Sequence, residues 1–176
     1  MKILKIILFI IVIIVAVVLL TALFVKKEYS ISKEITINKP KQAVFDYIKL
    51  LKNQDHYSKW VMQDPNIKKT FSGTDGSVGF VYAWDGNKDA GKGEQEITKI
   101  TEAERIDTEV RFEKPFAGVA EIYMTTKSTT DNQTKLTWVF NGRNNYPMNF
   151  MNLFMDQFLG KDMQKSLLLL KANLEK

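Results

Sequence analysis

The sequence predicts an α+β protein in which a curved antiparallel sheet of about six or seven strands wraps around a long C-terminal helix, preceded by one transmembrane helix. Three observations predict this class. An uncharged apolar run opens the chain, residues of alternating polarity fill its middle, and apolar residues at helical spacing close it. The 176 residues include three Trp, six Tyr and eleven Phe, which is enough aromatic surface to form a core and argues against disorder.

The N-terminal run has the length of a membrane span. From Ile6 to Val25 the chain carries no charge, and Thr21 is the only polar residue. Twenty helical residues cover roughly the 30 Å hydrocarbon core, whereas a cleaved signal peptide has an apolar region of only about 7–15 residues. We therefore expect an anchor at residues 1–27, membrane contact through residues 6–25 and one domain at residues 28–176. Lysines flank both ends of the run, so orientation is weakly indicated, and the short N-terminal tail favours a domain outside the cytoplasm.

The first elements of the domain follow from two changes of period. Residues 29–37 alternate in polarity, with Ile31, Ile35 and Ile37 on one face, and this predicts a strand. Pro40 is typical of a first helical turn, and the apolar spacing that follows predicts a helix over residues 41–51. We expect a second short helix over residues 53–60.

The middle of the chain returns to period two. Asp131 and Asn132 predict a hairpin turn between the last two strands, and two Gly-rich stretches predict loops. From about Met148 the chain is predicted to be helical, with Gly160 indicating a kink or close packing. The predicted strands cover residues 67–71, 80–84, 94–100, 105–112, 119–128 and 135–141.

The element order and seven short segments together resemble the START-like, helix-grip (SRPBCC, Bet v 1-like) superfamily, in its polyketide cyclase/dehydrase and lipid-transport branch. The resemblance covers residues 28–175 and implies a hydrophobic cavity between the sheet and the long helix, which often binds lipids, sterols or polyketide-like molecules. No set of residues defines one particular catalytic member. The segments are KPKQAVFDYI, the W-x-x-x-D-P stretch from Trp60 to Pro65, GSVGFVYAWDGN, GKGEQEIT, FEKPFAG, TKLTWVFNG and KSLLLLKANLEK.

The aromatic residues of the predicted strands fall in one period-two register. Such a set is often plain core, but a concave sheet under a single helix is hard to fill, which favours a ligand cavity. Asn141, Tyr82 and Glu121 are candidates for orienting the ligand. The expected cavity residues are Phe80, Tyr82, Trp84, Phe112, Tyr123, Trp138, Phe154 and Phe158.

Two carboxylates are the candidate catalytic groups. Glu94 shares a strand face with Glu96, and Glu121 shares one with Tyr123. On a cavity wall such an acid would be desolvated, its pKa raised, and suited to general acid–base chemistry. The alternative is that these carboxylates face solvent or are paired, with Arg111 on an outer charged face.

Charge and motif content exclude several other functions. The net charge of +5 is spread over lysines scattered among acids, with arginine only at positions 105, 111 and 143, so nucleic-acid binding is not predicted. His56 is the single histidine and cysteine is absent, which disfavours zinc sites and catalytic triads. Residues 86–93 resemble a phosphate-binding loop but lack Ser or Thr after the lysine. Residues 85–96 resemble a calcium loop but carry Ala90 where glycine is required.

The sequence thus predicts a membrane-anchored domain that binds a hydrophobic small molecule or lipid, with no cofactor, no metal and no nucleic acid as partner. One alternative is a cyclase, dehydratase or hydrolase that uses cavity carboxylates. Another is a protein-interaction module resembling the Hsp90-activator branch of the superfamily, which would need an exposed apolar patch instead of a deep pocket.

Overall fold

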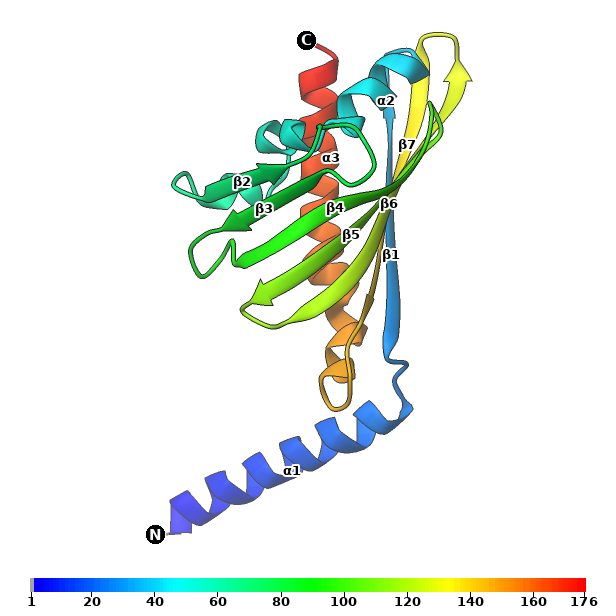
Figure 1. The fold of residues 1–176 in the computed structure, drawn as a ribbon. Helices are drawn as coiled ribbons and strands as arrows, with labels where there is room; N and C mark the ends of the chain where they lie inside the picture. Colours follow the sequence, from blue (N-terminus) through cyan, green and yellow to red (C-terminus); the bar gives the residue numbers. More distant parts are fainter. Residues whose placement is uncertain (1) are drawn as a thin grey trace.

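The computed structural model describes residues 2–176 and consists of a curved sheet wrapped around one long helix, with the N-terminal helix beneath them (Figure 1). The sheet has seven antiparallel strands in the order β1-β7-β6-β5-β4-β3-β2. The predicted fold class is therefore confirmed. The elements are α1 (Lys2–Phe24), β1 (Glu28–Ile37), α2 (Lys41–Lys49), η1 (Leu51–His56), η2 (Val61–Gln63), β2 (Lys68–Ser72), β3 (Val81–Asp85), β4 (Lys92–Thr101), β5 (Arg105–Lys114), β6 (Gly118–Thr130), β7 (Gln133–Arg143), η3 (Met148–Phe154), η4 (Asp156–Gly160) and α3 (Lys161–Leu174).

The strands form as their alternation predicts, because inward positions are apolar and outward positions are largely polar. Cross-strand pairing aligns Tyr82, Gln95, Val110, Ala120 and Gly142 in one row across five strands. Because side chains alternate between the faces of a sheet, this row and every second position beside it face the helix. The opposite face carries most of the charged residues of β4 and β5. The register thus separates a closed inner face from an ionic outer one.

The C-terminal helix is the main cover of the inner face. Met163, Leu167 and Leu170 lie one helical turn apart and are completely buried, whereas Leu168 is 55% exposed on the far side. A helix buries one stripe in this way when it packs on a single surface. The stripe therefore fixes α3 against the sheet.

The segment before α3 departs from the single regular helix that the sequence predicts. Residues 148–154 form a 3-10 helix and residues 156–160 a π-helix turn, so the helical phase is not constant before residue 161. Gly160 closes the π turn where it passes over β1. A Cβ on Gly160 would lie 2.7 Å from Cε of Lys33, which explains the glycine by close packing.

The predicted second short helix is instead two 3-10 turns, η1 and η2, which close one side of the sheet. Asp75 accepts hydrogen bonds from the backbone N–H groups of Leu51 (2.8 Å) and Lys52 (3.2 Å) and so satisfies free donors at the start of η1. No alternating or helical periodicity marks this stretch. Its conformation depends on a partner more than twenty residues away in the sequence.

The N-terminal helix stands apart from the sheet and touches the domain through η3. Among the described residues α1 is the one helix that is long and apolar enough to cross a membrane, and an N-terminal signal sequence would share both properties. Most of its side chains are exposed in the isolated chain. Its contact with η3 places the C-terminal end of α1 at one particular end of the domain (Figure 1).

Truncation of the buried stripe tests the packing of α3. Leu167→Ala leaves a cavity in a fully buried site and is expected to lower the free energy of unfolding by about 2–5 kcal/mol. Thermal unfolding of the full chain in mild detergent, followed by circular dichroism, should show this as a lower Tm. Leu168→Ala is the matched control on the exposed face and should change the stability by less than about 0.5 kcal/mol. Equal effects of both variants would contradict the placement of the stripe.

Candidate ligand-binding cavity

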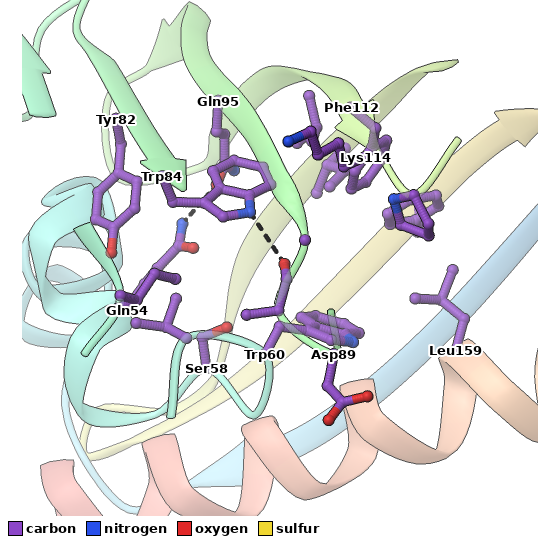
Figure 2. A pocket seen from close by; sticks show the side chains of 18 of the residues that line it. Gln54, Ser58, Trp60, Tyr82, Trp84, Asp89, Gln95, Phe112, Lys114 and Leu159 are labelled. Atoms are coloured by element: carbon purple, nitrogen blue, oxygen red, sulfur yellow. Dashed lines mark hydrogen bonds between the residues drawn. The ribbon is translucent and has the colours of Figure 1, made fainter. Parts of the chain in front are cut away.

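A cavity of about 360 Å³ lies between the inner face of the sheet, the η1–η2 segment and the start of the C-terminal helix (Figure 2). Most of its wall is carbon, with a few polar groups. The lining residues are Tyr29, Gln54, Ser58, Trp60, Val61, Ile67, Tyr82, Trp84, Asp89, Ala90, Gly91, Gln95, Val110, Phe112, Lys114, Pro115, Phe116, Ile122, Trp138, Phe140, Met155 and Leu159.

Aromatic rings form the walls, and their own contacts hold them in place. The indole Nε1 of Trp84 donates to the carbonyl of Ala90 at 3.1 Å, and its ring meets Phe112 edge-on with centroids 6.2 Å apart. Trp60 packs edge-on against Trp138 at 5.9 Å. These geometries are the favourable ones for aromatic pairs. The cavity walls are therefore shaped before any ligand arrives.

The floor of the cavity is polar but uncharged. Nε2 of Gln54 donates to Oε1 of Gln95 at 3.0 Å, and Nε2 of Gln95 donates to the hydroxyl of Thr108 at 2.9 Å. Figure 2 shows the two amides meeting across the cavity from η1 and β4. Gln95 is 9% exposed, so burial of its amide depends on these partners. The relay gives a ligand polar atoms to recognise without placing a charge in the interior.

A second set of polar groups, formed by Tyr82, Asp55 and Lys69, lies at one side of the cavity. The hydroxyl of Tyr82 donates to Oδ1 of Asp55 at 2.7 Å, and Oδ2 of Asp55 pairs with Nζ of Lys69 at 2.8 Å. Burial, and then the hydrogen bond to Asp55 and its charge, raise the pKa of Tyr82 far above its ordinary value of 10.0. The phenol therefore stays protonated and acts as a hydrogen-bond donor. Asp55 is occupied by two partners.

The cavity opens at one end of the sheet. Strand pairing places Asp85 beside Lys92 and Lys92 beside Lys114, so the β3–β4 and β5–β6 connections lie at the same sheet end. The exposed members of the lining all belong to these connections or border them, and they mark the mouth. They are Asp89, Lys114, Pro115 and Phe116.

A buried carboxylate holds the β3–β4 connection in place at the mouth. Oδ2 of Asp64 accepts from the backbone N–H of Asn87 at 2.7 Å, and its Oδ1 accepts from the N–H of Asn66 at 2.9 Å. Oδ1 of Asn87 in turn accepts from the N–H groups of Asp89 and Ala90. The segment that resembles phosphate and calcium loops is thus a turn organised by its own side chains. Among residues 2–176 no group of three or more His, Cys, Asp or Glu residues is placed to hold a metal ion.

Of the eight aromatic residues expected in the cavity, the structure brings four together in its wall: Tyr82, Trp84, Phe112 and Trp138. Phe80 faces the same side but lies in the core next to the cavity. Tyr123 is on the outer face, where the guanidinium carbon of Arg105 lies 3.6 Å from the ring centroid. The irregular phase of η3 and η4 turns Phe154 and Phe158 outward, and Met155 and Leu159 occupy the inward positions instead.

The two candidate catalytic carboxylates lie on the outer face, which corrects the expectation that they enter the cavity. Glu94 accepts from Arg111 at 2.6 Å, within a cluster in which Arg111 also bonds Glu96 and Glu109. Glu121 is paired across strands with Glu109 and Asn141, so Asn141 shares the outer face. Parity explains the result, because residues two apart on a strand share a face and the inward residues here are Gln95 and Ile122.

Sequence reasoning missed the polar floor. Gln95 could have been found, because it stands between Gly93 and Ile97 at an inward position of an alternating strand. A polar side chain at such a position needs a hydrogen-bond partner. Gln54 and Ser58 had no such signal, because η1 and the irregular residues between η1 and η2 show no periodicity. His56, the single histidine, is exposed on that same segment.

A curved sheet closed over one long helix, with an apolar cavity between them, defines a cavity protein of the helix-grip class. The chain belongs to the polyketide cyclase/dehydrase and lipid transport family, whose model matches residues 28–175. This confirms the resemblance seen in the sequence. No curated protein matches the chain.

Solved structures share the fold at low sequence identity. Norcoclaurine synthase from Thalictrum flavum, in complex with dopamine and hydroxybenzaldehyde, is 8% identical with a TM-score of 0.64, covering 84% of this chain and 86% of that one. A protein from Chromobacterium violaceum is 16% identical with a TM-score of 0.59, covering 84% and 97%. The di-domain ARO/CYC protein BexL, from the BE-7585A biosynthetic pathway, is 13% identical with a TM-score of 0.62, covering 85% and 51%. At these identities the similarity shows the fold alone.

The buried phenols predict a loss of stability at high pH. Burial raises the pKa values of both Tyr57 and Tyr82, so the folded chain keeps these protons above pH 10 while the unfolded chain releases them. The free energy of unfolding should therefore fall as pH rises past 10, by about 1.4 kcal/mol per pH unit for each such tyrosine. Tyr82→Phe should make this slope smaller, as measured by thermal unfolding of the full chain between pH 8 and 11. An unchanged slope would contradict the assignment.

Proposed function

We propose that this protein is a membrane-anchored binding domain that holds a hydrophobic small molecule or lipid in the cavity between its sheet and C-terminal helix. The observation that carries the proposal is the cavity itself, an apolar space of about 360 Å³ with an uncharged polar floor. Small-molecule sites are mostly apolar, about 300–1,000 Å³ in volume, and contain a few polar groups that orient the ligand.

The distribution of charge narrows the ligand chemistry. The deep wall contains aromatic and aliphatic groups with the amides of Gln54 and Gln95, and the charged members of the lining, Asp89 and Lys114, lie at the mouth. A neutral ring system or acyl chain fits inside, with one hydrogen-bonding group at the floor. At the outer end of the ligand, Lys114 can pair with an acidic group and Asp89 with a basic one. Burial of apolar surface, at roughly 25 cal/mol per Å², would supply most of the binding free energy.

Membership of the family supports the proposal that the cavity binds a ligand. The apolar N-terminal helix supports the proposal that the chain is attached to a membrane. The family description names lipid transport, and the fold relative from Thalictrum flavum was solved with two aromatic small molecules. In our proposal residues 1–27 anchor the chain and residues 28–176 bind the ligand outside the cytoplasm. Tethering would raise the effective concentration of a membrane-borne ligand at the mouth.

Acid–base turnover finds less support in the geometry. Glu94 is paired with Arg111 and Glu121 faces outward, so neither stands beside a bound molecule. The ionisable pair nearest the interior, Tyr82 and Asp55, is hydrogen-bonded to itself and to Lys69. Binding is therefore the function that the cavity supports best.

Filling the cavity should remove binding without disturbing the outer face. Val110 lines the cavity and Val119 is exposed on the other side of the sheet, so Val110→Phe and Val119→Phe form a matched pair. All three tryptophans of the chain line the cavity, so quenching of their fluorescence by a dibrominated fatty acid reports occupancy. With the full chain in nanodiscs, we expect Val110→Phe to weaken binding by about tenfold or more, which corresponds to about 1.4 kcal/mol.

A second cavity variant keeps the test valid if Val110→Phe fails to fold. Leu159→Phe narrows the cavity from the half-buried start of the C-terminal helix and should also weaken quenching. Equal quenching in the wild type and all three variants would contradict binding in this cavity. So would extraction of purified protein that yields no bound lipid or small molecule, combined with an absence of quenching.

A further inference from the structure

The end of the domain that carries the anchor also carries a group of exposed apolar side chains. Phe116 is 74% exposed, Leu153 55% and Met148 51%. These belong to the β5–β6 connection and to η3, which lie at the sheet end where β1 begins directly after the anchor. Exposed apolar groups gathered in this way mark an interaction surface. We name them the apolar rim, defined as Phe116, Met148, Met151, Leu153 and Phe154.

The η3 residues of the rim lie alongside the last turns of α1 and not past its C-terminal end. Four residues near the end of α1 are less exposed than the rest, at the spacing of a single helix face, and Ala22 is 2% exposed. From the first to the last of them the covered stretch rises about 10 Å. The domain therefore overlaps the last turns of the apolar helix through η3 (Figure 1). The four residues are Val18, Thr21, Ala22 and Val25.

Two asparagines of η3 make this contact specific. Nδ2 of Asn149 donates to the carbonyls of Ala22 (2.6 Å) and Val25 (2.7 Å), and Nδ2 of Asn152 donates to those of Lys26 and Lys27, both at 2.9 Å. The last carbonyls of a helix have no partner within it, so the Asn149 amide caps α1, and the Asn152 amide holds the residues that follow the helix.

The cap is itself held in place. Asn149 is 1% exposed, and Oδ1 of Asn152 accepts from Nδ2 of Asn144 at 2.7 Å. The backbone N–H of Asn144 also donates to the carbonyl of Lys27 at 2.9 Å. Side chains and backbone groups of η3 and of the residues before it thus hydrogen-bond to the C-terminal end of α1 and to the residues that follow it. The anchor joins the domain through a fixed joint instead of a free linker.

We propose that the apolar rim inserts into the lipid bilayer surface around α1, so that the cavity mouth faces the boundary between headgroups and acyl chains. This inference rests on the proposed membrane anchor. Because α1 brings η3 alongside its last turns, a membrane-spanning α1 sets the rim at interfacial depth. The mouth residue Phe116 is itself a member of the rim, so the cavity would open where a hydrophobic ligand leaves the bilayer.

Charge at the same end favours a bilayer as the occupant. Lys26 and Lys27 follow α1 directly, and Lys114 lines the mouth, all with exposed side chains. Lysines near a membrane surface are attracted to its anionic headgroups. Apolar groups flanked by lysines are typical of surfaces that lie in a membrane interface.

Site-directed spin labelling tests the insertion directly, since the chain has no natural cysteine. Phe116→Cys and Leu153→Cys place labels on the rim. Val78→Cys is the matched control, because Val78 is 61% exposed in the β2–β3 connection at the opposite end of the sheet. The full chain is reconstituted in vesicles of phosphatidylcholine and phosphatidylglycerol. We expect the rim labels to lose accessibility to a water-soluble nickel complex and gain accessibility to oxygen, relative to the Val78 label.

The possible outcomes separate this inference from the anchor on which it rests. Rim labels as accessible to the nickel complex as the control, in chain that resists alkaline carbonate extraction, would overturn the insertion and leave the anchor standing. The rim would then remain free for a protein partner. Chain that carbonate extracts from the vesicles would overturn the anchor and the insertion together. Neither result depends on whether the cavity binds a ligand.

Removal of the cap tests the fixed joint. Asn149→Ala deletes two hydrogen bonds to α1, so the Leu153 label should become more mobile and more accessible to the nickel complex in the same vesicles. Asn145→Ala is the control, because the side chain of Asn145 is exposed in the same segment. An equal effect of the two substitutions, or none from either, would contradict a joint that sets the depth of the rim.

Discussion

The packing of one helical stripe on a wide sheet is the constraint from which the other features follow. Seven strands about 4.8 Å apart make a sheet close to 29 Å across, whereas a helix with its side chains is about 10 Å wide. Met163, Leu167 and Leu170 therefore close only part of the inner face. The η1–η2 segment covers another part, and the space left beside the irregular start of the C-terminal helix is the cavity.

Hydrogen bonds within the protein hold several of the polar and aromatic groups around the cavity in place. Gln54, Gln95 and Thr108 form a relay across the floor, and Trp84 is bonded to the backbone of the loop at the mouth. Collapse would break these bonds and leave buried donors unpaired. On the other face, Arg111 and its three glutamates tie β4 to β5. The ionisable groups thus strengthen the wall from outside while the interior remains neutral.

Alternation in the sequence was enough to predict the sheet, the closing helix and four of the cavity aromatics, because those four stand in the same period-two register as buried residues of their strands. It failed for Tyr123, since β6 is apolar at Val119 and Tyr123 as well as at Ala120 and Ile122, and parity alone did not say which set faces inward. It failed for Phe154 and Phe158 because 3-10 and π turns shift the helical phase. The bonds of Asn149 and Asn152 to residues 22–27 had no signal in the sequence, because the bonded residues lie more than 120 positions apart.

The residues between β7 and α3 link α1, the sheet and the cavity. Asn149 caps α1 and Asn152 bonds the residues that follow it. Asp156 pairs with Lys33 of β1 at 2.8 Å, and Met155 and Leu159 line the cavity between these contacts. These contacts come from one short stretch of helix, so its residues cannot shift independently. The stretch from η3 to η4 therefore joins α1, β1 and the cavity wall through one continuous set of contacts.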